Sequence, residues 1–313
     1  MKKRSIALIL CFILALLLVV TACSTGKAAT PEVAVPEAAE KEESTVDESE
    51  SDEVAVPNGL AEEEIEIEFT TSDGRTLTGT YYPAANLNAP VVVLMHWAMG
   101  EKTDWEQIAY WLQNRGLAGI NENATADMPW LDSSWFPSMP VDKSYNVFTF
   151  TFYNCEDGGC QTFEREKWLL DVQAAFETAR TLEGVNSTKV VGIGASIGAD
   201  GAVDGCQYIN FHFPYTCHGA VSLSPGSYLT LNYKDVVDEL IDIEPVGVLC
   251  FYATGDAESA QTCESIEVNE NYTPVKYEGN YHGMMLIQPE LEHEPLTMIM
   301  EFLDATVGWD EGY

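Results

Sequence analysis

The chain has 313 residues, of which 46% are hydrophobic and 11% aromatic, which is enough for a folded core. Its 50 acidic residues outnumber 15 Lys and Arg and give a formal net charge of −35. This charge argues against nucleic acid as a partner, because phosphate contacts need positive side chains, and against anionic polymers as substrates.

The first 23 residues have the layout of a secretory signal peptide. Basic residues at positions 2–4 precede an unbroken apolar run at 6–20, which is short for a membrane-spanning helix. The run ends in Val-Thr-Ala-Cys, which resembles the lipobox of bacterial lipoproteins, where Cys23 would carry the lipid. We therefore predict export across the cytoplasmic membrane and a lipid anchor on its outer side, with a plain transmembrane anchor as the alternative.

Residues 24–64 are rich in Ala, Pro, Ser, Val and Glu and contain several adjacent acidic pairs. Such a segment has few large apolar groups to bury, and its charges repel one another. It is predicted to be an extended acidic tether without a partner of its own.

The folded region is predicted to start at residue 65 with a β-hairpin. Residues 65–69 alternate apolar and polar, 72–75 form a turn, and 77–82 are extended again. The continuous apolar run at 91–95 is typical of a strand buried on both faces of a parallel sheet.

A helix follows, with apolar side chains at helical spacing between Trp105 and Leu112, Asp104 as its cap and Gly116 as its end. Residues 118–144 have no clean periodicity and are a candidate lid or pocket wall. Further strands are expected at 145–153, 189–193, 220–223, 246–253 and 275–277, and further helices at 164–182, after 196, at 236–241 and at 294–305.

This order predicts a single α/β domain over residues 65–313. Strands that alternate with helices imply a mostly parallel sheet with helices on both faces, here preceded by an N-terminal β-hairpin. We find no second domain and no internal repeat.

A Gly-x-Ser-x-Gly string occupies residues 194–198, between a short apolar strand and a helix. A sharp, strained turn there needs small residues beside the serine and holds its hydroxyl at the carboxyl-terminal edge of the sheet. The amino terminus of the next helix directs N–H groups at the same place, which makes the Ile197 amide a natural oxyanion donor. Ser196 is therefore the candidate nucleophile.

With this motif the chain resembles the α/β-hydrolase family over about residues 65–303, near its dienelactone hydrolase-like and esterase-like members. The hairpin around Asp73-Gly74 is similar to the family's start. Met-His-Trp-Ala-Met-Gly at 95–100 stands in the place of its His-Gly-x segment, and Tyr-His-Gly at 281–283 in the place of its catalytic histidine turn. The resemblance implies the α/β-hydrolase fold and catalytic residues in the order Ser, acid, His.

Of the five histidines, His282 fits the base best, because it lies in a Gly-flanked loop after the last predicted strand and downstream of an acid. The turn at 254–258, Thr-Gly-Asp-Ala-Glu, resembles the family's Gly-Asp-Ala-Asp turn with the acid in the last place. That register favours Glu258 as the acid. Asp256 is the alternative, since either carboxylate could accept the histidine N–H bond.

The resemblance also places the second oxyanion donor at the backbone N–H of Ala98. The chain departs from the family at Trp97, where glycine is common, so the indole either caps the pocket or packs on the sheet edge. For the aromatic side chains, packing against the core is the alternative to a pocket role. Our candidate pocket residues are Trp97, Met99, Trp130 and Trp135.

Six of the eight cysteines remain after Cys11, in the signal peptide, and Cys23 are set aside. An even number in an exported chain favours disulfides, and no Cys-x-x-Cys or paired His spacing indicates zinc, so no metal is predicted. Short loops favour the pairs Cys155 with Cys160, Cys206 with Cys217, and Cys250 with Cys263.

These features predict a serine hydrolase, first of all a carboxylic ester hydrolase that acts on small-molecule esters through an acyl-enzyme and needs no cofactor. A serine peptidase of the prolyl oligopeptidase-like type is the second hypothesis, because related folds also begin with an Asp-Gly hairpin. A surface-displayed binding lipoprotein that has lost turnover is the third.

Overall fold

The computed structural model describes residues 59–156, 158–243 and 246–308. The predicted signal peptide, the lipidation site at Cys23 and the tether up to residue 58 lie outside the described residues. The chain divides into two units, Met1–Val54 and Ala55–Tyr313, and every described residue belongs to the second.

One eight-stranded sheet forms the centre of the described region, with the strand order β1-β2-β4-β3-β5-β6-β7-β8. The hairpin β1–β2 pairs antiparallel with β4, and the strands from β4 to β8 are parallel to one another. The strands are β1 (Ile65–Thr70), β2 (Thr76–Tyr82), β3 (Ala89–Met95), β4 (Asn146–Phe150), β5 (Val185–Ala195), β6 (Cys217–Leu223), β7 (Gly247–Ala253) and β8 (Tyr272–Tyr277).

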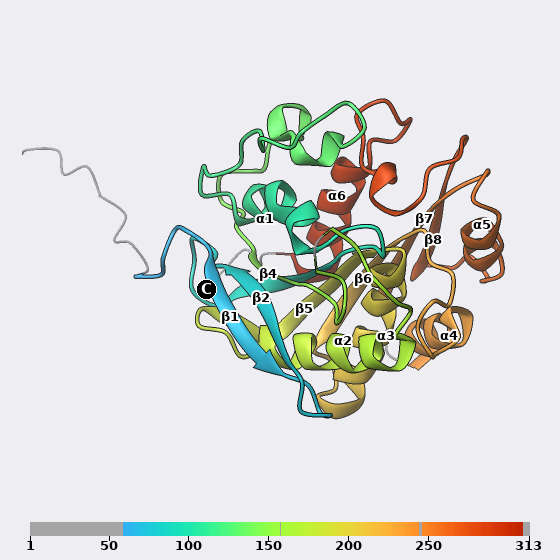
Figure 1. Cartoon of the computed structure of the whole chain (residues 1–313), viewed down its shortest axis with the longest axis horizontal. Helices are drawn as coiled ribbons and strands as arrows, with labels where there is room; N and C mark the ends of the chain where they lie inside the picture. Colours follow the sequence, from blue (N-terminus) through green and yellow to red (C-terminus); the bar gives the residue numbers. More distant parts are fainter. Residues whose placement is uncertain (1–58, 157, 244–245, 309–313) are drawn as a thin grey trace, which may run out of the picture. The chain divides into compact units, whose positions relative to one another are not determined.

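Helices cover both faces of this sheet (Figure 1). Helices α1 and α6 pack on one face, and α2, α3 and α4 pack on the other. The helices are α1 (Glu106–Gln113), α2 (Arg165–Ala179), α3 (Ile197–His212), α4 (Tyr233–Ile243), α5 (Ala257–Glu264) and α6 (Pro295–Val307), and the short 3-10 helices are η1 (Lys102–Trp105), η2 (Pro129–Leu131), η3 (Ser133–Trp135) and η4 (Gly283–Leu286).

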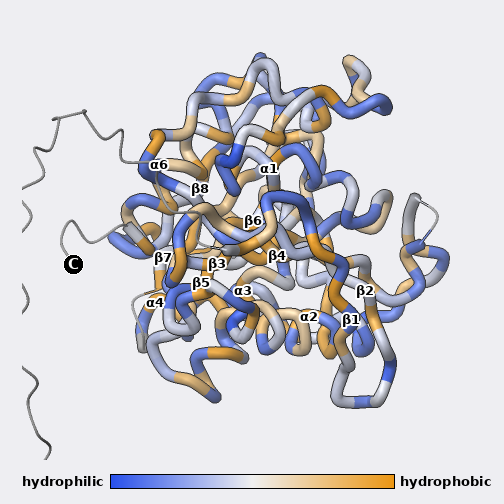
Figure 2. The backbone as a smooth tube through the Cα atoms, turned by 90° about the vertical axis from the view of Figure 1, so that its left-hand side faces the viewer, coloured by the Kyte–Doolittle hydropathy of each residue, from blue (hydrophilic) through white to orange (hydrophobic). Residues whose placement is uncertain are grey.

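The central strands are buried and largely hydrophobic (Figure 2). Every residue of β3 is buried, as expected for a strand with helices on both sides. Trp168 and Phe176 of α2 belong to the core on one face, while Ile108 of α1 and Leu303 of α6 belong to the core on the other. The predicted α/β class, the mostly parallel sheet and the N-terminal hairpin are confirmed.

Two predicted boundaries of helix α1 are wrong. Asp104 lies inside η1 and does not cap the helix; its carboxylate accepts a hydrogen bond from Trp97 Nε1 at 2.8 Å. The helix ends at Gln113, and its C-cap is Asn114, two residues before Gly116, with φ 51° and ψ 46°. Asparagine tolerates this left-handed conformation and can therefore end a helix in the place of glycine.

Residues 60–64, which we predicted as the end of the tether, hydrogen-bond to the domain. Gln113 Nε2 donates to the Glu62 carbonyl at 2.9 Å, and Arg115 Nη1 donates to the Ala61 carbonyl at 2.6 Å. The packed part of the chain thus begins several residues before β1.

The three predicted disulfides are confirmed: Cys155 with Cys160, Cys206 with Cys217, and Cys250 with Cys263. The first closes a loop after β4, the second joins α3 to β6, and the third joins β7 to α5. No helix within the described residues is long and apolar enough to span a bilayer.

Candidate active site

Ser196 lies in a strained turn between β5 and α3. Its backbone has φ 53° and ψ −112°, and its N–H donates to the carbonyl of Leu223 in β6 at 2.8 Å. The two flanking glycines permit this turn. A Cβ at Gly194 would lie 1.9 Å from the Gly198 carbonyl oxygen, and a Cβ at Gly198 would lie 2.3 Å from the Met95 carbonyl oxygen. The serine is thus presented at the carboxyl-terminal edge of the sheet, next to the end of β3.

A hydrogen-bonded series runs from Ser196 through His282 to Asp256. His282 Nε2 lies 2.9 Å from Ser196 Oγ, and His282 Nδ1 lies 2.7 Å from Asp256 Oδ2. The three residues follow β5, β8 and β7, whose carboxyl ends lie at one edge of the sheet. With its proton on Nδ1, the imidazole donates to Asp256 and presents the Nε2 lone pair to the hydroxyl. This arrangement can take a proton from the serine.

The carboxylate that contacts His282 is Asp256 and not Glu258, the acid that we favoured from the sequence. Asp256 is the N-cap of α5, and its side chain accepts from the Ser259 N–H as well as from His282. Glu258 is exposed in the first turn of α5. The helix begins directly after Asp256, so Glu258 lies within the first helical turn and only Asp256 stands at the cap that meets His282.

The environment of Asp256 favours its charged form. Burial raises the pKa of this carboxyl, but the hydrogen bonds from His282 and Ser259 outweigh burial and hold the pKa below its ordinary value. A charged carboxylate at this place fixes the histidine ring and stabilises the imidazolium that forms when the ring accepts a proton.

The loop after β3 is held by His96, which is fully buried. His96 Nε2 accepts a hydrogen bond from the Phe152 N–H at 3.0 Å, so its Nδ1 is the donor to the Trp97 carbonyl at 2.7 Å. The Trp97 carbonyl also accepts from the Gly100 N–H at 3.2 Å. The ring thus connects the loops after β3 and β4 beside the strained turn at residues 194–198, which we call the elbow. The sequence indicated the position of His96 in a motif but not this contact.

Acid should destabilise the fold through His96. Burial lowers the pKa of this histidine from 6.5 to about 4. Between these values the unfolded chain binds a proton that the folded chain does not, so this contribution to stability is lost as the pH falls from 6.5 through 4. For a fully buried group it amounts to about 3 kcal/mol.

Urea unfolding at pH 7.5, 5.5 and 4.5 measures this effect. We expect the His96→Gln variant to be less stable at pH 7.5 but to lose less stability on acidification than the wild type. His218→Gln is the control, because His218 is only half-buried and its Nε2 donates to the Thr188 carbonyl at 2.8 Å. Equal pH slopes for wild type and His96→Gln would contradict the prediction.

The four candidate pocket residues have different environments. Trp97 is 8% exposed and lies beside the histidine turn, since its Cε3 would be 2.9 Å from a Cβ at Gly283. Trp130 is 2% exposed and packs edge-on against Trp97, with the ring centroids 5.9 Å apart. Trp135 is half-buried and donates to the Pro129 carbonyl, whereas Met99 is 71% exposed. Trp97 therefore borders the site, and Trp130 is a core residue.

Residues 118–144 form a packed segment. An antiparallel bridge joins Ile120 to Asp132, and the segment contains η2 and η3. Trp111 of α1 donates through Nε1 to the Pro137 carbonyl at 2.7 Å. These contacts hold the segment against the domain, and its role as a lid stays a prediction.

Ser224 supports the histidine turn, which the sequence did not indicate. This fully buried residue follows β6, and its Oγ accepts the Gly283 N–H at 3.0 Å. Its backbone has φ 60°. The bond ties the turn that carries His282 to the end of the neighbouring strand.

Asp200, in the first turn of α3, supports the opposite side of the histidine. Its carboxylate accepts from the N–H groups of Gly226, Tyr228 and Leu229, and the Tyr228 ring lies edge-on to the His282 ring at 6.2 Å. Burial raises the pKa of Asp200 to about 7, against the opposing effect of these N–H groups. In the sequence, the only signal that Asp200 supports the site was a single acid among small and apolar residues just after the Gly-x-Ser-x-Gly string.

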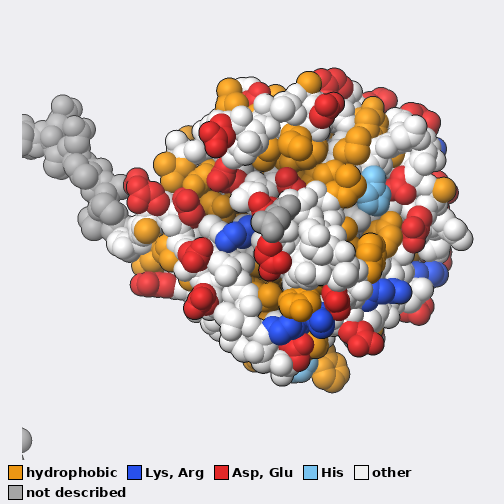
Figure 3. All heavy atoms as spheres, in the orientation of Figure 1, with side chains coloured by type: hydrophobic (Ala, Val, Ile, Leu, Met, Phe, Trp, Pro, Cys, Tyr) orange, Lys and Arg blue, Asp and Glu red, His pale blue; other side chains and the backbone are white. Residues whose placement is uncertain are grey.

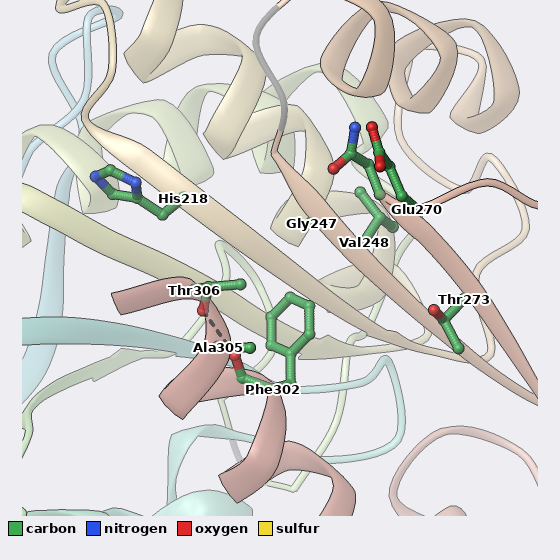
Figure 4. Close-up of a pocket in the computed structure, with 9 residues that line it drawn as sticks. His218, Gly247, Val248, Glu270, Thr273, Phe302, Ala305 and Thr306 are labelled. Carbon is green, nitrogen blue, oxygen red and sulfur yellow. Dashed lines mark hydrogen bonds between the residues drawn. The ribbon is translucent and has the colours of Figure 1, made fainter. Parts of the chain in front are cut away.

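A separate cavity of about 370 Å³ lies at the other end of the strands, beside α6 (Figure 4). Its lining includes His218, Gly247, Glu270 and Phe302, and none of the three residues of the hydrogen-bonded series. Among the described residues, no group of three or more His, Cys, Asp and Glu is placed to hold a metal ion.

Acidic side chains are spread over the face of the molecule in Figure 3, and Lys and Arg are few there. Hydrophobic side chains lie between them over much of the same face. This distribution agrees with the formal charge of −35 and favours neutral or cationic ligands over anionic ones.

No protein-family model matches the sequence, and a search of curated proteins finds no match. Solved structures do match. An esterase from Pyrococcus furiosus is 17% identical, with a TM-score of 0.54, over 79% of this chain and 94% of that one. A dienelactone hydrolase-like promiscuous phosphotriesterase from metagenomic libraries is 12% identical, with a TM-score of 0.51, over 78% of this chain and 98% of that one.

A third similar structure is a protein from Agrobacterium tumefaciens described as a proposed α/β-hydrolase. It is 16% identical, with a TM-score of 0.51, over 77% of this chain and 95% of that one. These similarities agree with the sheet order and with the strained turn between β5 and α3. The chain therefore has the α/β-hydrolase fold.

Proposed function

We propose that this protein is a serine hydrolase that cleaves carboxylic esters through an acyl-enzyme. The observation that carries the proposal is the hydrogen-bonded series Ser196, His282 and Asp256, with 2.9 Å between Oγ and Nε2 and 2.7 Å between Nδ1 and Oδ2. A serine hydroxyl is a weak nucleophile unless a base takes its proton, and the base needs an acid to fix its tautomer. The esterases among the similar structures support the same reaction.

In the first half of the reaction, His282 Nε2 takes the proton of Ser196 as Oγ bonds to the ester carbonyl carbon. The carbonyl oxygen becomes an oxyanion. When the tetrahedral intermediate collapses, the bond to the alcohol oxygen breaks, and the alcohol leaves with the proton from His282. Asp256 stays charged and stabilises the transient imidazolium.

In the second half, water enters the place of the alcohol. His282 takes a proton from the water as its oxygen bonds to the acyl carbon, and the same proton then returns to Ser196 Oγ as the acid is released. The cycle uses no group other than the described side chains and amides, and the serine hydroxyl is regenerated.

Two backbone amides are proposed to hold the oxyanion. The Ile197 N–H is the first of α3 and so has no partner within the helix. The Ala98 N–H belongs to the same peptide unit as the Trp97 carbonyl, which is bonded to His96 Nδ1 and the Gly100 N–H. In a trans peptide the N–H points away from the carbonyl, so the Ala98 amide is directed away from His96.

The proposal is tested with a fluorophosphonate probe on the full-length chain. The serine oxygen displaces fluoride from phosphorus, so we expect one covalent adduct, located on Ser196 by mass spectrometry of the peptides. Heat-unfolded protein is the control and should not react. An intact, folded protein that is not labelled at Ser196 would refute the proposal.

Substrate class is decided by paired assays. Because ester and amide hydrolysis use the same steps, 4-nitrophenyl acetate and matched peptide 4-nitroanilides should be compared at equal enzyme concentration. We expect turnover of the ester and little of the anilide. Preference for the anilide would favour the peptidase hypothesis, and no turnover of either by labelled, folded protein would favour a binding role.

We also propose that the protein is exported and lipid-anchored through Cys23. The three disulfides support export, since such bonds persist in oxidising compartments. Metabolic labelling with a radioactive fatty acid is expected to mark the wild type but not Cys23→Ala. Equal labelling of both would contradict the anchor site.

A further inference from the structure

A disulfide closes the loop after β4, and this loop is bonded to the loop after β3. The described residues of this disulfide loop are 155, 156 and 158–160. The Cys160 N–H donates to the Ala98 carbonyl at 2.8 Å. Ala98 supplies one of the two oxyanion amides in the function proposed above. We infer that the disulfide loop is a positioning element for the Ala98 amide, an inference that rests on that proposed function.

Gly159 lets the two loops approach each other closely. Its φ is +150°, and a Cβ there would lie 3.2 Å from the Ala98 carbonyl oxygen and 3.5 Å from Met99 Cα. A residue with a side chain would adopt this backbone conformation only with strain, and its Cβ would press on the backbone of the loop after β3. The close approach of the two loops thus depends on glycine at position 159. It brings the Cys160 N–H within hydrogen-bond distance of the Ala98 carbonyl.

The disulfide connects Cys160 to a fixed point in the core. Cys155 is 0% exposed, and its N–H donates to the Phe152 carbonyl at 3.1 Å. Phe152 in turn donates through its N–H to His96 Nε2. The residues between the cysteines include two glycines, which have more backbone freedom than other residues. The covalent bond restricts this freedom and holds the Cys160 amide in place.

The two peptide units on either side of the Ala98 Cα are therefore both restrained. The unit before it is held at the Trp97 carbonyl by His96 and Gly100, and the unit after it is held at the Ala98 carbonyl by Cys160. Only the φ and ψ angles of Ala98 relate these two planes to each other. When both carbonyls are bonded, the direction of the Ala98 N–H is fixed. The Ala98 N–H lies in the first unit, so loss of the bond from Cys160 acts on it through the Ala98 Cα, which both units share, and permits the loop to shift.

The experiment compares the full-length wild type with the double variant Cys155→Ala/Cys160→Ala on 4-nitrophenyl acetate. Complete loss of one oxyanion donor costs about 10²- to 10³-fold in kcat, and a loosened donor retains part of its effect. We expect kcat to fall by about tenfold or more while KM changes by less than about twofold. A fall in kcat with a nearly unchanged KM identifies an effect on the transition state and not on substrate binding.

Cys206→Ala/Cys217→Ala is the matched control. It removes a buried disulfide that joins α3 to the start of β6, at the opposite end of the parallel strands from the loop after β3. We expect this variant to melt at a lower temperature and to keep a kcat within about twofold of the wild type, because stability and oxyanion geometry are separate properties.

Gly159→Ala is the second variant, and it keeps the disulfide. It should lower kcat in the same way, because the added methyl presses on the Ala98 carbonyl. Wild-type kcat in folded Gly159→Ala and folded Cys155→Ala/Cys160→Ala would overturn the inference. Equal loss of kcat in the two double variants would also overturn it. A folded wild type without esterase activity would instead overturn the proposed function, and the inference with it.

Discussion

Replacing Ser196 by Ala is expected to lower kcat for ester hydrolysis by about 10⁶-fold, because no other group can form the acyl-enzyme. The substitution removes Oγ, the atom that lies 2.9 Å from His282 Nε2. Residual turnover would come only from the oxyanion amides and substrate binding. The measurement is kcat from steady-state initial rates at high enzyme concentration. The melting temperature is measured on the same samples.

The matched control is Ser222→Ala in β6. Its hydroxyl is also buried but donates to the Ala199 carbonyl at 2.8 Å instead of to the histidine. We expect this control to lose about 1 kcal/mol of stability and to change kcat by only a few-fold. If Ser196→Ala keeps more than about one hundredth of wild-type kcat while folded, the serine is not the nucleophile.

Replacing Asp256 by Asn is expected to lower kcat by about 10⁴-fold. An amide that donates toward His282 Nδ1 favours the wrong tautomer, which leaves Nε2 protonated and unable to accept the serine proton. Asparagine is as good an N-cap as aspartate, so α5 should remain capped and the fold intact. The variant therefore separates the chemical role of Asp256 from its structural one.

Glu258→Gln is the direct comparison, because it changes a carboxylate two residues away to an amide of the same size. This side chain is exposed on α5 and is not the partner of His282. We expect kcat within about threefold of the wild type. A large loss in Glu258→Gln together with a small loss in Asp256→Asn would return the acid to the position that the sequence alone favoured.

The sequence predicted the parts of this fold that depend on neighbouring residues. The apolar run at 91–95 has an apolar side chain at every position, which is typical of an inner strand of a parallel sheet. The disulfide pairs were predictable because each joins cysteines that are 5 to 13 residues apart, and short loops leave few other partners. The glycines of the elbow indicated a strained turn by their spacing.

The boundaries of α1 and the identity of the acid were not predictable, because they depend on contacts between distant segments. At the end of α1, Asn114 Nδ2 donates to the carbonyls of Pro140 and Lys143 at 2.9 and 2.8 Å. At the acid turn, the Gly255 N–H bonds to the Gly279 carbonyl at 2.7 Å. This contact with the histidine loop sets which side chain of the turn faces His282, and no local pattern contains it.

The sequence by itself determined the class of fold, the elbow with Ser196 and the candidate histidine, because glycine spacing and apolar runs restrict the backbone locally. Only the tertiary structure decided that Asp256 meets His282, that His96 and Cys160 hold the two carbonyls around Ala98, and that Trp130 belongs to the core. The physical reason is that these contacts join residues that are far apart in the sequence. A hydrogen bond between the ends of different strands requires their spacing and register to be fixed first, and these arise from packing of the whole sheet against its two helical layers.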